Sequence, residues 1–306
     1  MTARPTRPPM LLPAELPDPA LLAQMRRIEI RARRLASTLL AGDYRSAFRG
    51  SGIEFAEARE YTPGDDVRLI DWNVTARMGA LWVKQYVEER ELPVVCAVDV
   101  SASQTVAHSP RGRIGPAAKL TALLSFAAVY QHDRTGLLTF TDRIEEFVPP
   151  ARGTRHVLRL LREVLHGERE GAGTSIAAAC EYLARVLKRR SVVFLISDFA
   201  DRGYDQALRT LARRHEVIAL PLIDPLDLEL PDLGLVEVED AEHGTRRLVD
   251  TSDIEFRREY AAAAAERARL RSATLAAAAV DEVPLRLDQD LARPLVRYFR
   301  ARAAHR

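Results

Sequence analysis

The sequence predicts an α/β fold in which helices cover both faces of a doubly wound, mostly parallel sheet. The first observation is a pattern: from residue 93 onward, short apolar runs typical of buried strands alternate with stretches of helical periodicity. Such a β-α-β order favours parallel strands that are joined by right-handed crossovers. The second observation is length, because 306 residues suffice for one large domain of this kind with a smaller appendage.

The first 42 residues are predicted to form an arm and one helix. Residues 1–17 are rich in proline and are predicted to be disordered. Asp18 and Pro19 then have the character of an N-cap and a first helical residue, and Gly42 ends a helix predicted over residues 18–42. One face of this helix is apolar, and the other carries Arg26, Arg27, Arg31, Arg33 and Arg34. This basic face is either solvated or a contact surface for nucleic acid, acidic lipid or an acidic protein.

Residues 43–92 differ in character, since glycine- and proline-containing turns dominate them. Strand-like pieces such as 81–87 lie between these turns, so the segment is predicted to be a small β-rich subdomain built on hairpins. Two interpretations of its central part stay open. In one, Trp72 packs the subdomain against the main sheet. In the other, Trp72 and Arg77 anchor a partner protein, with Asp65 and Asp66 as further candidate partner-binding residues.

Residues 93–240 carry the alternating pattern of the main domain. The expected strands cover residues 93–98, 135–140, 144–148, 192–196 and 217–222. Helices are expected from Pro116, from a cap at Thr154, after Ser175 and over residues 205–214. The run 192–196 is the clearest strand, because its consecutive apolar residues fit a position buried on both faces.

Residues 241–306 are predicted to complete this domain with a hairpin and helices. Residues 236–238 and 246–249 are expected to pair as a hairpin at the edge of the sheet. A capping box over residues 252–255 opens a long helix rich in alanine and arginine. Residues 285–287 are expected to form a last strand, and Asp288 is expected to cap the terminal helix.

Composition excludes several classes of protein. The net charge of +2 argues against a dedicated nucleic-acid binder, and no apolar run approaches the length of a membrane-spanning helix. The proline-broken start does not have the character of a secretory signal, so a cytoplasmic protein is expected. Cys96 and Cys180 are too few for a disulfide scaffold and are predicted to be buried reduced thiols.

Oxygen-bearing side chains gather where strands are predicted to end. Asp99, Ser101 and Ser103 follow the first strand of the main domain, and Asp198 follows the clearest strand, while Thr174 lies in a glycine-rich loop. Sheets of this class place ligands at the carboxyl ends of their strands. Two carboxylates and three hydroxyls suit a hard cation, Mg²⁺ or Mn²⁺, better than zinc. A coordination position left to water then accepts a carboxylate from outside.

This arrangement of D-x-S-x-S, a distant threonine and a further aspartate resembles the metal-ion-dependent adhesion site of von Willebrand factor A domains, which have a Rossmann-like fold. A second set of segments is similar to the bacterial family called domain of unknown function 58, over roughly residues 20–240. These segments are Ser51–Phe55, Arg59–Trp72, Thr75–Arg77, Glu88–Glu91, Asp224–Leu226 and Leu230–Pro231. The resemblance implies a small β segment before a von Willebrand A-like domain. It also implies an adaptor role, because members are commonly encoded beside MoxR-type AAA+ ATPases. Many members carry transmembrane helices, and this chain resembles the shorter branch without them.

Three functions remain open. The leading one is a non-catalytic, Mg²⁺-dependent protein-interaction module, an adaptor or co-chaperone that works with a MoxR-type AAA+ ATPase and recognises a client protein through a carboxylate. The second is a haloacid-dehalogenase-like phosphatase, which needs an aspartate where Ser101 stands and a phosphate-binding lysine that neither Lys119 nor Lys188 clearly supplies. The third is an acidic-surface or nucleic-acid binder that uses the arginine-rich helix and shows steep salt dependence.

Overall fold

The computed structural model describes residues 19–37, 44, 53–88, 92–105, 112–171, 173–239 and 245–304. The predicted arm over residues 1–17, Asp18 and Gly42 lie outside these residues. The core is a seven-stranded sheet in the order β10-β7-β6-β3-β4-β5, with β11 also paired to β7. Its strands are β3 (Val94–Asp99), β4 (Thr135–Phe140), β5 (Ile144–Ala151), β6 (Val192–Ser197), β7 (Glu216–Ile223), β10 (Asp281–Glu282) and β11 (Leu285–Arg286).

The order and direction of the strands establish the fold class. β3 pairs in parallel with both β4 and β6, and β7 continues the parallel sheet beyond β6. Only β5 runs antiparallel to its neighbour, β4, at one edge. Numbered from β3 along the chain, the strands follow the order 3-2-1-4-5-6 of a doubly wound sheet. The predicted fold class is confirmed.

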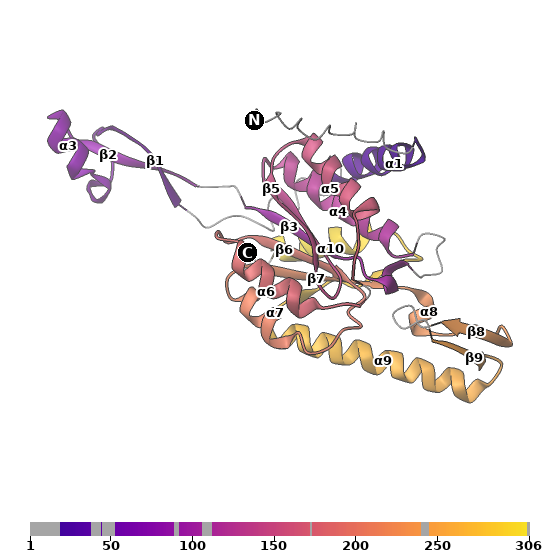
Figure 1. Cartoon of the computed structure of the whole chain (residues 1–306). Coiled ribbons are helices and arrows are strands. Elements are labelled where there is room, and N and C mark those ends of the chain that lie inside the picture. Colours follow the sequence, from indigo (N-terminus) through magenta and orange to yellow (C-terminus); the bar gives the residue numbers. More distant parts are fainter. Residues whose placement is uncertain are drawn as a thin grey trace, which may run out of the picture.

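Helices cover both faces of the sheet, as Figure 1 shows. One apolar core lies under α1 (Pro19–Leu35), α4 (Ile114–Tyr130), α5 (Thr154–His166) and α10 (Ala292–Ala304). A second core on the other face lies under α6 (Ile176–Val186), α7 (Asp205–Ala212) and α9 (Ile254–Ala277). Because side chains alternate along a strand, Cys96 enters the first core and its neighbours Val95 and Ala97 enter the second. Cys180 enters the second core; both cysteines are buried free thiols, as predicted, and burial raises the pKa of each to about 12.

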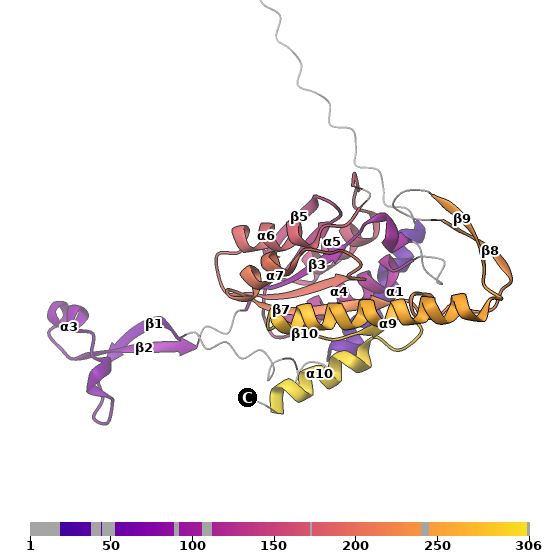
Figure 2. The same cartoon turned by 90° about the horizontal axis from the view of Figure 1, so that it is seen from below.

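A separate small unit is formed by β1 (Ile53–Glu60), paired antiparallel with β2 (Trp82–Glu88). A short 3-10 helix, η2 (Val67–Leu69), and the helix α3 (Trp72–Met78) lie between the two strands. The helix α3 is not part of the predicted hairpins. Asp71 caps it by accepting hydrogen bonds from the amides of Asn73 and Val74, so the turn-like segment continues into a helix. Figures 1 and 2 show this unit standing away from the main sheet.

The orientation of Trp72 corrects one of the two sequence interpretations. Its side chain is 67% exposed on α3 and does not pack the subdomain against the sheet. The reason is that Val83 and Ile70, not the tryptophan, are the buried apolar residues of the β1–β2 unit among those whose side chains are described. Trp72 therefore remains exposed to solvent in the monomer.

Three details of the C-terminal region also differ from the prediction. The hairpin β8 (Leu235–Glu239) with β9 (Arg246–Asp250) is a sheet of its own, because β10 and β11 take the edge beside β7. Asp253, rather than Ser252, caps α9. The amide of Ala292 at the start of α10 donates to Asp290 at 2.9 Å, whereas Asp288 pairs with Arg286. Similarly, Thr154 is the first residue of α5, and Gly153, at a φ of 94°, precedes it.

Candidate metal centre

The carboxyl ends of two adjacent strands carry the two aspartates of the candidate site. Asp99 is the last residue of β3, and Asp198 directly follows β6, its parallel neighbour. Ser101 follows β3, and Ser103 lies in the next element, the 3-10 helix η3 (Ala102–Thr105). Thr174 comes from the loop between α5 and α6. Three chain segments therefore meet at one edge of the sheet, where a doubly wound fold binds its ligands.

Hydrogen bonds join the hydroxyls into a continuous chain. The hydroxyl of Thr174 donates to Oγ of Ser101 at 2.8 Å, and Oγ of Ser101 lies 3.1 Å from Oγ of Ser103. Ser103 in turn donates to Oδ2 of Asp198 at 3.4 Å. The amide of Ser101 donates to Oδ1 of Asp99 at 3.0 Å, so the same segment also contacts the second carboxylate, that of Asp99. The structure thus brings all five predicted residues together.

Asp99 is almost fully buried, with 1% of its surface exposed. The hydroxyl of Ser197 donates to its Oδ2 at 2.7 Å, in addition to the bond from Ser101. Burial and, second, the charge of Asp198 raise the pKa of Asp99 to about 6. A bound cation is expected to offset both effects, because a nearby positive charge favours the ionised carboxylate of Asp99.

The donor set fits a hard divalent cation. Its members offer only oxygen, and Mg²⁺ and Mn²⁺ prefer oxygen ligands. Within the part of the chain that the structure describes, no group of three or more histidine, cysteine, aspartate or glutamate residues is placed to hold a metal. At this edge the three hydroxyls therefore have to supply ligands alongside the two carboxylates. Occupation by Mg²⁺ or Mn²⁺ stays a prediction.

Arg113, which the sequence analysis did not single out, lies beside this cluster. Its guanidinium donates to the carbonyl of Ser103 at 2.9 Å and lies 3.7 Å from Oδ2 of Asp198. It also contacts both carboxylate oxygens of Asp227 at 2.6 Å. The arginine side chain is only 8% exposed. It therefore links Ser103 to Asp227 in the segment after β7 from within the protein. No sequence pattern distinguishes Arg113 from the many other arginines of the chain.

Gln104 is a second residue that the sequence analysis missed. Its side chain is buried, and Nε2 lies 3.4 Å from Oδ2 of Asp99 and 3.3 Å from Oγ of Ser103. The amide thus bridges the two ends of the serine loop. The position directly after D-x-S-x-S is the signal that points to it, because a residue there continues into η3 and faces back to the strand end.

The loop that carries Thr174 is held by a compact set of contacts. Glu145 accepts hydrogen bonds from the amide of Gly171 at 2.9 Å and from the hydroxyl of Thr141 at 2.5 Å. The amide of Ser175 donates to the carbonyl of Thr141 at 2.8 Å. These bonds fix the loop at both ends, so the position of Thr174 depends on the close approach of the loop to β4 and β5.

Replacing Gly171 with alanine is expected to displace Thr174 and weaken the affinity for Mg²⁺ by about tenfold or more. A Cβ at this position meets Oγ1 of Thr141 at 2.0 Å and Oδ1 of Asp142 at 2.1 Å, so the loop has to shift. Positioning errors of this kind are costly for a site that needs convergent ligands. Gly173→Ala is the matched control, since its Cβ has an ordinary contact of 3.8 Å with Asp142. Calorimetric titration of both variants with MgCl₂ measures the difference, and equal affinities would contradict the role of the loop.

The candidate partner-binding residues lie on the β1–β2 unit, apart from the metal cluster (Figure 1). Asp65 accepts hydrogen bonds from Nη1 and Nη2 of Arg59, and this pairing lowers the pKa of the aspartate. Asp66 accepts from the amide of Arg68 and caps η2. Both acids therefore shape the turn, whereas Trp72 and Arg77 are exposed on α3. A partner contact through these residues stays a prediction.

Comparison with known proteins assigns the family. The model of the family described as "Protein of unknown function DUF58" matches residues 57–269. The uncharacterized protein Rv1480 of Mycobacterium tuberculosis is 34% identical over 298 residues, which cover 96% of this chain and 94% of that protein. The uncharacterized protein MAV169 of Mycobacterium avium is 36% identical over 157 residues, which cover 50% of this chain and 92% of that protein.

Two solved structures are similar over most of their length. A conserved hypothetical protein, BatB from Bacteroides thetaiotaomicron, aligns with a TM-score of 0.44 and 14% identity over 70% of this chain and 100% of its own. The SpRpn10 VWA domain aligns with a TM-score of 0.40 and 12% identity over 68% of this chain and 95% of its own. The strand order described above, and not these matches, assigns the doubly wound sheet.

In the described residues, no helix has both the length and the apolar character to cross a bilayer. The family match includes the segments 59–72 and 224–231, on which the resemblance was predicted, and therefore confirms it. This chain, with its doubly wound sheet, its hydroxyl-and-carboxylate edge and its projecting β1–β2 unit, belongs to the DUF58 family.

Proposed function

We propose that this chain is a non-catalytic interaction module whose sheet edge binds Mg²⁺ or Mn²⁺ and, through the ion, a carboxylate of a partner protein. One observation supports the proposal above all others: the hydroxyls of Thr174, Ser101 and Ser103 form a chain that ends on Asp198. When bound, the ion supplies a coordination position that an outside carboxylate takes from water.

The protein side chains have distinct tasks in this proposal. Asp99 supplies buried negative charge at the base of the site, and Asp198 supplies a second charge nearer the surface. The three hydroxyls orient their oxygens toward one place without adding charge. Arg113 and Gln104 hold the serine loop against the strand end, so that the ligands are arranged before the ion arrives.

A cavity beside the metal edge favours an acidic partner. It has a volume of about 270 Å³, and its lining includes Arg113, Asp198, Tyr260, Arg267 and Arg271. Arg113 is paired with Asp227, and Arg271 is paired with Glu282. The exposed guanidinium of Arg267 lies over the ring of Tyr260 and has no ion pair among the described residues. It is therefore placed to meet a further acid on the partner that offers the coordinating carboxylate.

The β1–β2 unit offers a second surface, which we assign to a MoxR-type AAA+ ATPase. The family resemblance implies this partner class. The unit exposes a set of large apolar side chains: Val67, Leu69, Trp72, Met78 and Leu81. Apolar and aromatic residues that stay exposed together mark interaction surfaces more often than isolated ones do. In this arrangement the ATPase docks on one unit while a client protein binds at the metal edge, which is the arrangement of an adaptor.

Pull-down assays test the two surfaces separately. With Mg²⁺ present, capture of the client is expected to fail for Asp99→Ala and after EDTA treatment, whereas capture of the ATPase is expected to fail for Trp72→Ala. Asp232→Ala is the control, because that aspartate is exposed and its ion pair with Arg257 lies on another part of the surface. Client capture that is equal in the wild type, in Asp99→Ala and in EDTA would exclude the metal-dependent function.

The structure provides no specific support for either alternative. A phosphatase of the haloacid-dehalogenase type needs an acid where Ser101 stands, and the hydroxyl of that serine is engaged with Thr174 and Ser103. Lys119 lines a different cavity, and Lys188 donates to the carbonyl of Arg185. Magnesium-dependent hydrolysis of p-nitrophenyl phosphate that is lost in Asp99→Asn would favour the enzyme instead.

The basic helix is not a uniform surface either, which weakens the nucleic-acid alternative. Arg33 pairs with Glu29 and lies over the ring of Phe126. Arg27 and Arg31 instead line a cavity between α1 and its neighbours. Arg33 is therefore engaged within the protein, and the structure gives no specific support for a phosphate-binding surface on α1.

A further inference from the structure

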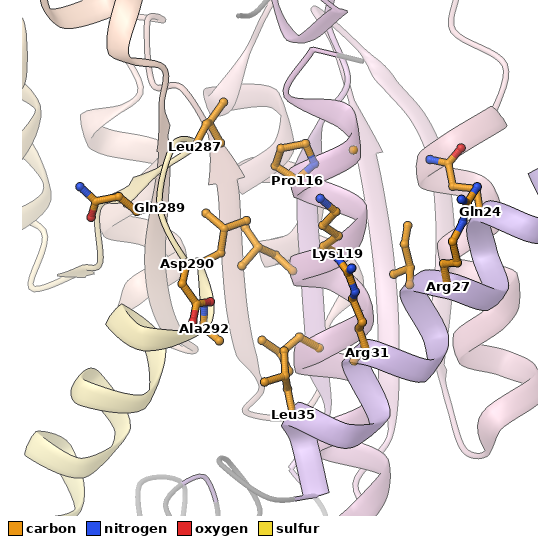
Figure 3. Close-up of a pocket in the computed structure, with 16 residues that line it drawn as sticks. Gln24, Arg27, Arg31, Leu35, Pro116, Lys119, Leu287, Gln289, Asp290 and Ala292 are labelled. Atoms are coloured by element: carbon orange, nitrogen blue, oxygen red, sulfur yellow. The ribbon is translucent and has the colours of Figure 1, made fainter. Parts of the chain in front are cut away.

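A cavity with a volume of about 580 Å³ lies on the α1 side of the sheet, and Figure 3 shows residues that line it. Three elements enclose it: α1, the N-terminal half of α4, and the segment from residue 287 to the start of α10. Its volume falls within the range of small-molecule sites, roughly 300–1,000 Å³. None of the residues of the candidate metal centre lines it.

The floor of this cavity is apolar. Ile28 of α1 and Leu120 and Leu123 of α4 are almost fully buried, and they form the inner wall. Leu287 and Leu291, which are half-buried, close the opposite side. Carbon-rich walls on more than one side favour a ligand with an apolar chain that leaves water when it enters.

The charged side chains of the cavity are mostly cationic. Arg27 and Arg31 come from α1 and Lys119 comes from α4, and Figure 3 shows them on the wall across from Asp290. In the described part of the chain none of these three cations has an ion pair, whereas Arg33, also on α1, pairs with Glu29. Asp290, the one acid among the described residues that line the cavity, accepts a hydrogen bond from the amide of Ala292 at the start of α10.

We propose that this cavity binds an amphipathic carboxylate: a single linear apolar chain with one acidic head group. The apolar floor takes the chain, and the three cations around the mouth take the acid. A nucleic acid would leave the apolar floor unused. This proposal is independent of the proposed function at the metal edge, because the two sites share no residue.

Calorimetric titration of the full chain with octanoate and decanoate tests the apolar part. Each added methylene group is expected to tighten binding about fourfold, so decanoate should bind about fifteenfold more tightly than octanoate. Decanol, which has the chain without the charge, should bind more weakly than decanoate. EDTA in all solutions keeps the metal edge out of the measurement.

The charge part is tested with Arg27→Gln/Arg31→Gln/Lys119→Gln. Loss of three partly exposed charge interactions is expected to weaken decanoate binding about tenfold while the preference for the longer chain remains. Arg26→Gln is the matched control, because this exposed arginine lies on the same helix and does not line the cavity. Leu291→Ser makes the floor polar at a half-buried position and should lower the chain-length preference instead.

Three results would overturn the proposal. Absence of decanoate binding to the wild type would exclude the proposal. Equal losses of decanoate affinity in Arg26→Gln and in the triple variant would mean that general surface charge, and not the cavity, attracts the ligand. The third result concerns other occupants. If an acidic helical peptide rich in leucine binds with the same dependence on the three cations and decanoate does not, the cavity belongs to a partner protein. If the three cations instead control dimerisation in sedimentation experiments, it belongs to a second copy of the chain.

Discussion

Replacing Asp99 with asparagine is expected to abolish the stabilisation of the folded protein by Mg²⁺ while the fold is retained. For a one-site ligand at a concentration one hundred times its dissociation constant, the wild type gains about 2.7 kcal/mol of unfolding free energy. The variant gains nothing, because the buried charge that attracts the ion is gone. An asparagine oxygen still accepts the hydrogen bond that the amide of Ser101 gives to Asp99 at 3.0 Å.

The same substitution changes the pH dependence of the metal-free protein. The pKa of Asp99 is raised to about 6 in the fold, above the ordinary value of about 3.9, so the folded state holds this proton more tightly than the unfolded state does. The stabilisation from this group is therefore complete below about pH 4 and is lost as the pH rises through about 6. The loss amounts to about 2–3 kcal/mol at neutral pH. In EDTA at pH 8, Asp99→Asn should therefore be more stable than the wild type.

Urea unfolding at pH 5 and pH 8, with MgCl₂ or with EDTA, measures both effects. Asp133→Asn is the control. Burial raises the pKa of Asp133 to about 7 at the opposite end of the sheet, where it accepts from the amide of Leu92. Its replacement should alter the pH profile in the same direction but leave the response to Mg²⁺ intact. A Mg²⁺ response that survives in Asp99→Asn would show that the ion binds elsewhere.

Phe299→Ala is expected to be the most destabilising of the substitutions considered, at about 3–5 kcal/mol of unfolding free energy. The ring of Phe299 is fully buried and meets the rings of Tyr44 and Phe194 edge-on, at centroid distances of 5.6 and 6.4 Å. Truncation leaves a cavity between α10 and the middle of β6 and removes two aromatic contacts. The C-terminal helix is thus part of the core of the main domain.

The control for this prediction is Leu270→Ala on α9, where the leucine is 53% exposed and its loss should change stability by less than about 0.5 kcal/mol. Chemical denaturation with a common slope for both variants measures the difference. A cost below about 1 kcal/mol for Phe299→Ala would mean that α10 packs only loosely on the sheet.

The main sheet was predictable because its strands are buried on both faces and therefore appear as continuous apolar runs, as in Val192–Ile196. Once those runs are known to be parallel neighbours, their carboxyl ends must meet, which is why Asp99 and Asp198 could be placed together. The two-residue strand β10 was not predictable, since so short a segment has no periodicity and exists only through its pairing with β7. The helix α3 was missed for a different reason: its N-cap Asp71 and C-cap Gly79 lie within a run of turn-forming residues, and the helix between them has only seven residues.

The supporting residues of the candidate site escape sequence analysis for a related reason. Arg113 contacts Asp227, which lies 114 positions later in the chain, and the sequence near either residue carries no pattern that predicts the contact. In a chain with 45 lysines and arginines, one arginine in a loop carries no distinguishing pattern. Thr174 was accessible only because a known motif directs attention to a threonine in that interval. Without the motif, its loop is one more glycine-rich connection.

The residue that follows Asp198 has a consequence for how this edge responds to the rest of the molecule. Phe199 adopts a φ of 58°, a backbone conformation that costs a non-glycine residue roughly 1 kcal/mol or more. Its buried ring packs edge-on against the ring of Tyr204, at a centroid distance of 6.1 Å. This packing helps to stabilise the unusual backbone conformation of Phe199. Tyr204 directly precedes α7, so a change in how α7 packs on the sheet is expected to alter the backbone beside Asp198.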